Sequence, residues 1–554
     1  MMFFFIFLIF LFVIFTILRH FLYNKSSEKI HFRRHKMVTS FSILPNEYWW
    51  GGSIVGSEKM PFSAETEFRI DLLWERRTQS APLFLSSKGR YIWSEEPFVI
   101  TFSKGEITLE SQYEIIVDQP GETLRDAYLA AMQRHFPFEK DIHTPREFYQ
   151  HPQFNTWMEL IKNQNQQDIL TYAHEIIDHG YQPGLLIIDG GWQKCQGTWE
   201  FIPEKFPDPK AMFDELHRLG FQVLIWASPF VCSEGENFLK LYSSRSSEAK
   251  GGVPNYNHLV RNKNGEVSIQ KWWSGFGAIL NFNLPDDCAF LDEQLQKLLD
   301  YGADGFKFDG GAYRPDSFIN GNEFYGSFSH SQLNQAWIKF GSQYRLHEFK
   351  DTWKACGKPV MQRLWDKNHA WEGNGLDCLI PNGIFTGLIG SPFICPDMVG
   401  GGEWTAFVYG KHEEELFIRM AQTSALFPMM QFSSLPWRHL SEKAVRLCKE
   451  MAELHERMYP EIEKILCETE KNGEPIIRSM EYQFPGHGFE KINDQYMVGD
   501  KILVAPVVHK GLVQRVVHFP EGTWQDELGH SFTGPVDAMV DAPVEVLPWF
   551  RRVD

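Results

Sequence analysis

The pattern of apolar and polar positions changes twice along the chain. Between residues 40 and 140, short extended runs such as Thr66–Leu73 and Phe98–Phe102 are separated by turn residues. Runs of this kind are typical of antiparallel strands. After residue 460 the same texture returns, for example in Lys501–Ala505. We therefore expect a β-sandwich on each side of a central region.

The central region alternates between continuous apolar runs and segments with helical spacing. Gly184–Ile188 and Phe221–Trp226 are predicted strands, and the helix between them is expected to begin after Asp208 and to end before Gly220. Ala278–Phe282 continues the alternation as a further strand. Parallel strands connected by helices over about 300 residues predict a (β/α)8 barrel. An open doubly wound sheet is the alternative, but no Gly-x-Gly-x-x-Gly motif follows a predicted strand.

Residues 2–18 form an apolar run without a charged side chain, which is just long enough for a helix that spans a bilayer. No small-residue cleavage site precedes Arg19, and this favours an uncleaved anchor over a signal peptide. The basic residues that follow point to a cytosolic flank, whereas the sequon Asn24-Lys25-Ser26 points to the lumen. The predicted divisions are an anchor at 1–27, an N-terminal sandwich at 28–148, a barrel at 149–458 and a C-terminal sandwich at 459–554.

Charge and cysteine spacing limit the classes of partner and cofactor. The net charge of −17 argues against nucleic acid as a partner, because phosphate binding needs a basic surface. The eight cysteines show no Cys-x-x-Cys spacing, so the sequence predicts neither a zinc site nor a dense disulfide framework. We expect a site that uses no metal and no cofactor.

Carboxylates gather at the predicted carboxyl ends of the barrel strands. Phe306–Phe308 is an alternating run that ends in Asp309 before two glycines. Loops at this edge line the mouth of a barrel, where such folds keep their chemistry. The candidates at the mouth are Asp189, Trp226, Asp309, Arg363, Asp366 and Asp397. Two carboxylates without a metal suit glycoside hydrolysis, and an indole can stack on a sugar ring, although a capping Asp and a core Trp are the alternative interpretations of Asp189 and Trp226.

Several motifs at these strand ends resemble glycoside hydrolase family 31. They are Ile187–Gln193, Trp226–Phe230, Gly305–Asp309, Pro392–Gly401 and Asp494–Asp500, and the resemblance extends in order over residues 45–550. It implies a (β/α)8 barrel between β-sandwich domains that hydrolyses α-glycosides with retention and without a metal. The nucleophile of the family falls on Asp309.

The proton donor is expected at a different motif. The Trp-x-Gly-Asp segment of most family members is missing, and Gln362–Asp366 stands there instead. This segment resembles the branch that contains the myogenesis-regulating glycosidase and related bacterial α-galactosidases, in which the acid/base carboxylate falls on Asp366. Asp397 then lines the sugar site, and its use as the donor is the alternative. The branch favours α-galactosides; α-glucosides or α-xylosides, transglycosylation and a catalytically silent glycan-binding relative are the other hypotheses.

The two aspartates need opposite electrostatic surroundings. We expect Lys307, on the same strand face as Asp309, to keep that carboxylate ionised. A neighbouring anion and an apolar wall, Trp365 or Trp371, are expected to raise the pKa of Asp366. The alternative for Lys307, and likewise for Arg363, is an ion pair with some other carboxylate.

The segment with Trp272 and Trp273 supplies a further aromatic candidate. We expect one ring to pack and the other, taken as Trp273, to stack on the substrate. Anchored members of the family favour a type II-like membrane protein with a lumenal or extracellular catalytic domain, and secretion after signal cleavage is the alternative.

Overall fold

The computed structural model describes residues 37–74, 78–138, 143–242, 258–262, 266–311, 329–405 and 412–554. The predicted membrane anchor at 1–27 lies outside these residues. Within them, no helix combines the length and the apolar character that crossing a bilayer requires.

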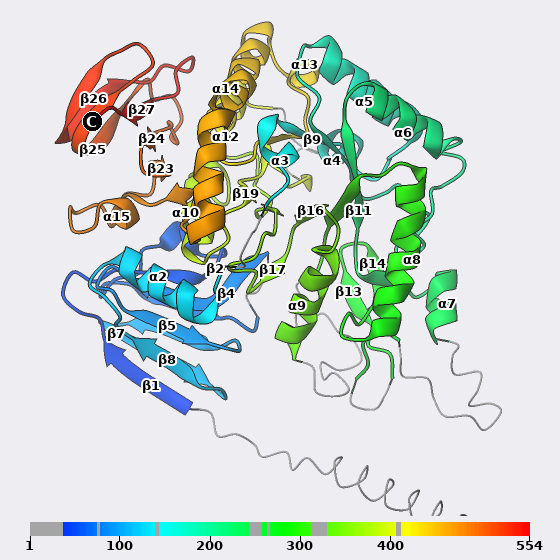
Figure 1. Ribbon diagram of the computed structural model, residues 1–554, viewed down its shortest axis with the longest axis horizontal. Helices are drawn as coiled ribbons and strands as arrows, with labels where there is room; N and C mark the ends of the chain where they lie inside the picture. Colours follow the sequence, from blue (N-terminus) through cyan, green and yellow to red (C-terminus); the bar gives the residue numbers. More distant parts are fainter. Residues whose placement is uncertain are drawn as a thin grey trace, which may run out of the picture.

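The N-terminal part folds as two facing antiparallel sheets (Figure 1). One contains β1 (Met37–Ser42), β7 (Glu106–Ser111), β6 (Val99–Ser103) and β3 (Phe68–Asp71). The other contains β2 (Trp49–Ser53), β4 (Gln79–Ser86), β5 (Tyr91–Ser94) and β8 (Ile115–Asp118), with β17 (Thr352–Trp353) of the barrel region at its edge. The ring centroids of Phe84 and Phe102 lie 6.2 Å apart between the two sheets. Helix α2 (Leu124–His135) follows the two sheets.

The central region forms a barrel of parallel strands. In spatial order these are β19 (Ile394–Cys395), β18 (Gln362–Arg363), β16 (Leu346–Phe349), β15 (Gly305–Phe308), β11 (Gln222–Ala227), β10 (Leu185–Ile188), β9 (Gln153–Asn155), β21 (Gln431–Phe432) and β20 (Met398–Val399). β19 and β20 are separated only by Pro396 and Asp397, and the Met429 N–H donates to Ile394 O at 3.3 Å. The sheet is therefore nearly closed, and the prediction of a (β/α)8 barrel is confirmed.

Helices cover the outside of the barrel. The longer ones are α5 (Gln166–Asp178), α6 (Pro209–Arg218), α8 (Pro285–Tyr301), α9 (His330–Gly341), α10 (Leu379–Leu388), α12 (Glu414–Ser424) and α14 (Glu442–Asn472). The start of α6 follows from its sequence, because the Asp208 side chain accepts a hydrogen bond from the Ala211 N–H and Pro209 occupies the first turn.

One predicted barrel strand belongs to a different sheet. Ala278–Phe282 overlaps β14 (Gly275–Ile279), which pairs antiparallel with β12 (Phe230–Cys232) and β13 (Gln270–Trp272). This small sheet is inserted after β11, so the prediction of a barrel strand here is wrong. An apolar run of this length fits either sheet, because it shows burial but not the partner strand.

The C-terminal part is one antiparallel sheet, which differs from the predicted sandwich. Its strands run in the order β22 (Ile477–Arg478), β23 (Tyr496–Val498), β24 (Ile502–Val504), β27 (Trp549–Arg552), β25 (Gln514–Gln525) and β26 (Ser531–Asp541). Residue 459, where we placed the start of this domain, lies inside the continuous helix α14.

Candidate active site

Aromatic packing sets the direction of the side chains of β15. The rings of Phe306 and Phe308 pack on the α9 side, with centroids 4.9 Å from Tyr344 and 5.1 Å from Trp337. The side chain between them, Lys307, is therefore turned into the barrel, because successive strand residues face opposite sides. Its Nζ lies 2.5 Å from Oδ2 of the buried Asp189 at the end of β10. Lys307 thus forms an ion pair with Asp189, which is the alternative named in the sequence analysis, rather than the expected pair with Asp309.

Asp309 follows β15 and is held by two N–H donors. Trp226 Nε1 donates to Oδ2 at 2.8 Å, and the Gly310 N–H donates to Oδ1 at 2.8 Å. The Trp226 side chain is only 2% exposed, and a Cβ at Gly190 would lie 3.4 Å from its indole. Trp226 therefore orients Asp309 through the edge of its ring, and its covered face does not offer the stacking surface that we expected.

Asp366 lies just beyond β18 and accepts from two cations. Lys350 Nζ is 2.9 Å and Arg363 Nη1 is 2.7 Å from Asp366 Oδ1, while 31% of the Asp366 side chain stays exposed. Arg363 Nη1 also binds Asp397 Oδ1 at 2.6 Å. Asp397 is fully buried, and its Oδ2 accepts from the backbone N–H groups of Lys367 and Gly402 at 2.7 and 2.9 Å. Of these two carboxylates, Asp366 is the one that can reach a substrate.

The electrostatic surroundings of Asp366 differ from the prediction. Burial favours a higher pKa, but Lys350 and then Arg363 outweigh it and hold the pKa of Asp366 well below its ordinary value. Neither predicted tryptophan reverses this: Trp371 Nε1 donates to Glu413 at 3.0 Å, and Trp365 lies beneath the ammonium group of Lys367. Asp366 is therefore a carboxylate in the ligand-free protein, which is the form that a general base needs.

Comparison with known proteins decides the family. The model described as "Glycosyl hydrolases family 31 TIM-barrel domain" matches residues 149–463, and the model of the family's C-terminal domain matches residues 473–554. The chain belongs to glycoside hydrolase family 31. It is 29% identical over 424 residues to the myogenesis-regulating glycosidase of Mus musculus. The matched region covers 74% of this chain and 57% of that protein. It is 23% identical over 484 residues to the alpha-xylosidase XylQ of Lactiplantibacillus pentosus, covering 81% and 59%.

Solved structures show the same fold. The Flavobacterium johnsoniae family 31 dextranase complexed with glucose superposes with a TM-score of 0.77 at 19% identity, covering 93% of this chain and 66% of that one. An alpha-xylosidase from a soil metagenome complexed with xylose gives a TM-score of 0.76 at 20% identity, covering 93% and 79%. The chain spans 57% of the first curated relative and 59% of XylQ.

In this family 31 chain, two charged residues of the site, Lys350 and Asp351, were not predicted from the sequence. They follow β16, the strand between those that precede Asp309 and Asp366. Burial, followed by the negative charge of Asp309, raises the pKa of Asp351 to about 7; Asp366 adds to the rise and Lys350 opposes it. A sequence pattern could have identified them: the short run Leu346–Phe349 is followed directly by charged residues, as the β15 segment is.

Replacing Asp351 with asparagine is expected to move the basic limb of the pH profile of kcat/KM to lower pH. Asp351 is the carboxyl group whose pKa of about 7 lets it hold a proton near neutral pH, whereas Lys350 and Arg363 hold the pKa of Asp366 well below its ordinary value. The neutral amide cannot supply that proton, so activity is lost at a lower pH than in the wild type. We expect a displacement of at least about one pH unit, measured by initial rates of glycoside hydrolysis between pH 4 and 9.

The matched control is Asp377→Asn. Asp377 binds the backbone N–H groups of Gly373 and Gly375 in the loop beyond Asp366, so its loss changes the loop but not a charge that acts on the reacting carboxyl groups. A basic limb that stays in place in Asp351→Asn, or that moves equally in the control, contradicts the prediction.

The two tryptophans of the inserted sheet behave differently. Trp272 stacks on Phe230 with a centroid distance of 4.0 Å, whereas the Trp273 side chain is 56% exposed. The Phe230 ring lies next to the turn after Asp309, since a Cβ at Gly310 would be 2.8 Å from it. Trp272 is therefore the packing residue, and Trp273 is the one available to a ligand at this edge of the site.

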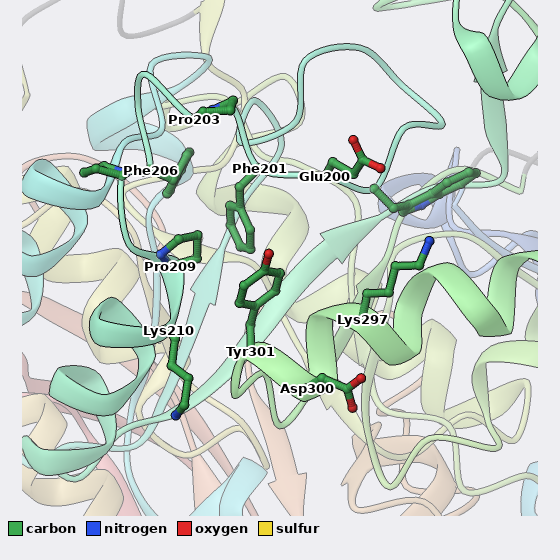
Figure 2. A pocket seen from close by; sticks show the side chains of 11 residues that line it. Glu200, Phe201, Pro203, Phe206, Pro209, Lys210, Lys297, Asp300 and Tyr301 are labelled. Carbon is green, nitrogen blue, oxygen red and sulfur yellow. The ribbon is translucent and has the colours of Figure 1, made fainter.

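A separate cavity lies between the loop after β10 and the end of α8 (Figure 2). Its volume is about 650 Å3, and Glu200 and Phe201 face Lys297, Asp300 and Tyr301 across it. None of the predicted site residues lines this cavity. In the part of the chain that the structure describes, no cluster of three His, Cys, Asp or Glu side chains is arranged to hold a metal ion.

Proposed function

We propose that the chain is a retaining α-glycosidase with Asp309 as the nucleophile and Asp366 as the acid/base. The observation that carries the proposal is that Lys350 bridges the two strand ends: its N–H donates to the O of Phe308, the residue before Asp309, at 3.0 Å, and its Nζ donates to Asp366 Oδ1 at 2.9 Å. This contact supports a site shared by the two aspartates. Their surroundings differ: Asp309 is oriented by neutral N–H groups, and Asp366 by two cations. Two carboxylates with separate environments suit double displacement.

In the first step, an Asp309 oxygen attacks the anomeric carbon while Asp366 gives a proton to the departing oxygen. In the second step, Asp366 takes a proton from water, and the resulting hydroxide oxygen displaces Asp309 from the sugar. The ligand-free carboxylate state of Asp366 fits the second step. For the first step a proton has to reach Asp366, and Asp351 is the neighbouring group whose pKa of about 7 lets it carry one near neutral pH.

The remaining predicted contacts are satisfied by protein partners in this state. Asp189 and Lys307 form one buried ion pair, and Arg363 and Asp397 form another. We propose that these pairs shape the floor of the sugar site, with Trp273 at its edge. Their direct contact with a substrate stays a prediction.

We propose α-galactosides as the favoured substrates. The support is the resemblance of Gln362–Asp366 to the branch with bacterial α-galactosidases, together with the 29% identity to the myogenesis-regulating glycosidase. Relatives named for α-xylosidase and α-glucosidase activity make those sugars the comparison substrates.

The test is hydrolysis of the nitrophenyl α-galactoside, α-glucoside and α-xyloside by the full chain, with the anomer of the first product followed by NMR. We expect the highest kcat/KM on the α-galactoside and an α-configured product. Higher activity on another sugar overturns the substrate assignment, and an inverted product overturns the mechanism. Folded protein that hydrolyses none of the three overturns the enzymatic proposal and favours a glycan-binding relative. Transfer to an added sugar acceptor in preference to water identifies a transglycosidase.

A further inference from the structure

One buried side chain connects the N-terminal sheets to the acid/base side of the site. Gln79, the first residue of β4, is fully buried. Its Nε2 donates to Lys350 O at 2.8 Å and to Arg363 O at 3.1 Å. These two carbonyls belong to the residues whose cationic groups bind Asp366 Oδ1. A single amide therefore joins the two backbone positions from which both cations of Asp366 extend.

The orientation of this amide follows from its surroundings. Both N–H groups of Gln79 Nε2 meet carbonyl oxygens, which only accept hydrogen bonds. A flipped amide would place Oε1 against those same two oxygens, so that three acceptor oxygens would meet without a donor between them. Within the described residues, Oε1 has no hydrogen-bond partner, so nothing on that side competes for the orientation. The two backbone carbonyls are what hold the Gln79 side chain.

The contact is part of a continuous interface. β4 pairs in parallel with β17, with Gln79 opposite Thr352 and Ser80 opposite Trp353. The Thr352 N–H donates to Thr78 O at 3.0 Å, and Thr352 Oγ1 donates to Gln362 Oε1 at 2.7 Å. Thr352, two residues after Lys350, is thus bound both to the start of β4 and to the side chain of Gln362, the neighbour of Arg363. A change at Gln79 acts on two strands at once.

We propose that Gln79 is a positioning residue for the proton-transferring carboxylate, because it fixes the spacing between Lys350 and Arg363. This inference rests on the proposed function. If either backbone position moves, one cation moves relative to Asp366 Oδ1, and both the direction and the charge balance of that carboxylate change. Asp309 is not affected in the same way, since its donors are Trp226 and Gly310, which Gln79 does not contact. Loss of Gln79 therefore impairs protonation of the leaving group more than attack on the sugar.

The test compares two substrates of the same sugar in Gln79→Met, which keeps a similar length and removes both donors. A disaccharide has a poor leaving group that needs a proton, whereas a dinitrophenyl glycoside has a leaving group that departs without one. We expect kcat/KM on the disaccharide to fall at least about tenfold, a part of the roughly 10^2- to 10^4-fold contribution of general acid catalysis, and on the dinitrophenyl glycoside by less than about threefold. Equal losses on both substrates, or no loss on either, overturn the proposal.

Ser80→Ala is the matched control. Ser80 is the next residue of β4 and equally buried, and its hydroxyl has no hydrogen-bond partner in the described part of the chain. It is expected to leave both rates at the wild-type value, and a disaccharide-selective loss there would assign the effect to strand packing and overturn the proposal. Thermal unfolding of each variant confirms that the folded protein is compared.

Gln79→Glu is a second variant that also covers the case in which the methionine variant does not fold. Its protonated carboxyl group donates one hydrogen bond to a carbonyl, and its ionised form donates none. We expect its disaccharide activity, relative to wild type, to fall as pH rises, while its dinitrophenyl activity follows wild type. A constant ratio across pH contradicts the proposal. A wild-type protein that hydrolyses neither substrate means instead that the proposed function fails.

Discussion

Asp309→Asn is expected to reduce kcat on every substrate by a factor on the order of 10^4, the scale of loss when a covalent catalytic group is removed. The amide is nearly the same size as the carboxylate but does not attack the anomeric carbon. The loss is expected to be independent of the leaving group, because no substrate bypasses formation of the covalent bond. Steady-state rates on the disaccharide and on the dinitrophenyl glycoside measure this.

A covalent trap provides a second measurement. A 2-deoxy-2-fluoro glycosyl fluoride forms the ester with Asp309 but is released slowly, so wild-type protein is expected to gain one sugar mass on a peptide that contains Gly305–Gly311. The variant is expected to gain none. Asp304→Asn is the matched control: Asp304 lies at the other end of the same strand, where its carboxylate accepts from the Val223 N–H at 2.7 Å and contacts His217 at 2.9 Å. Labelling of a different aspartate, or loss of labelling in the control, contradicts the assignment.

Asp366→Ala is expected to show a loss that depends on the leaving group. On a disaccharide, kcat/KM is expected to fall by about 10^2 to 10^4, the usual contribution of general acid catalysis. On a dinitrophenyl glycoside the first step proceeds without a proton, so the covalent intermediate accumulates and its breakdown becomes rate-limiting. Added azide attacks the intermediate without needing a base. We expect it to restore turnover and to give an α-glycosyl azide, detected by NMR.

Asp397→Ala separates the two candidates for the proton donor. Asp397 is buried and binds Arg363 together with the backbone at Lys367 and Gly402. Its loss leaves a buried guanidinium with one carboxylate fewer, so we expect a lower melting temperature and similar rate losses on both substrates, without rescue by azide. Azide rescue in Asp397→Ala and none in Asp366→Ala would exchange the two roles.

The strand-end position of Asp309 could be predicted because a short alternating run and two glycines describe a strand and its end locally. Lys307 could be placed on the inward face for the same reason. Its partner could not be predicted, since Asp189 follows β10, and β11 lies between that strand and β15. Periodicity gives the face of a side chain, whereas the height at which two strands meet depends on the register of the closed barrel.

Trp226 and Asp351 show the same limit at the site. The sequence places Trp226 at a strand end but does not say whether the face or the edge of its indole is free. In the structure, a face of the Trp226 indole packs against Gly190, and the Nε1 edge of the ring donates a hydrogen bond to Asp309. Asp351 was overlooked because Leu346–Phe349 contains His347 and Glu348, which weaken the apolar pattern. Both are buried inside the fold, where Gln431 Nε2 donates to Glu348 Oε2 at 2.8 Å, so a buried strand here carries polar residues.

The order of the main elements and the residues at several strand ends follow from local patterns, because periodicity, turn residues and helix caps act over a few neighbouring positions. The charge state of Asp366 depends on the fold, since Lys350 and Arg363 reach one oxygen from two strands. The role of Gln79 depends on it even more: its side chain binds carbonyls 271 and 284 residues away. Interactions between residues so far apart in the sequence form only after the N-terminal sheets have docked on the barrel. No local sequence pattern predicts them.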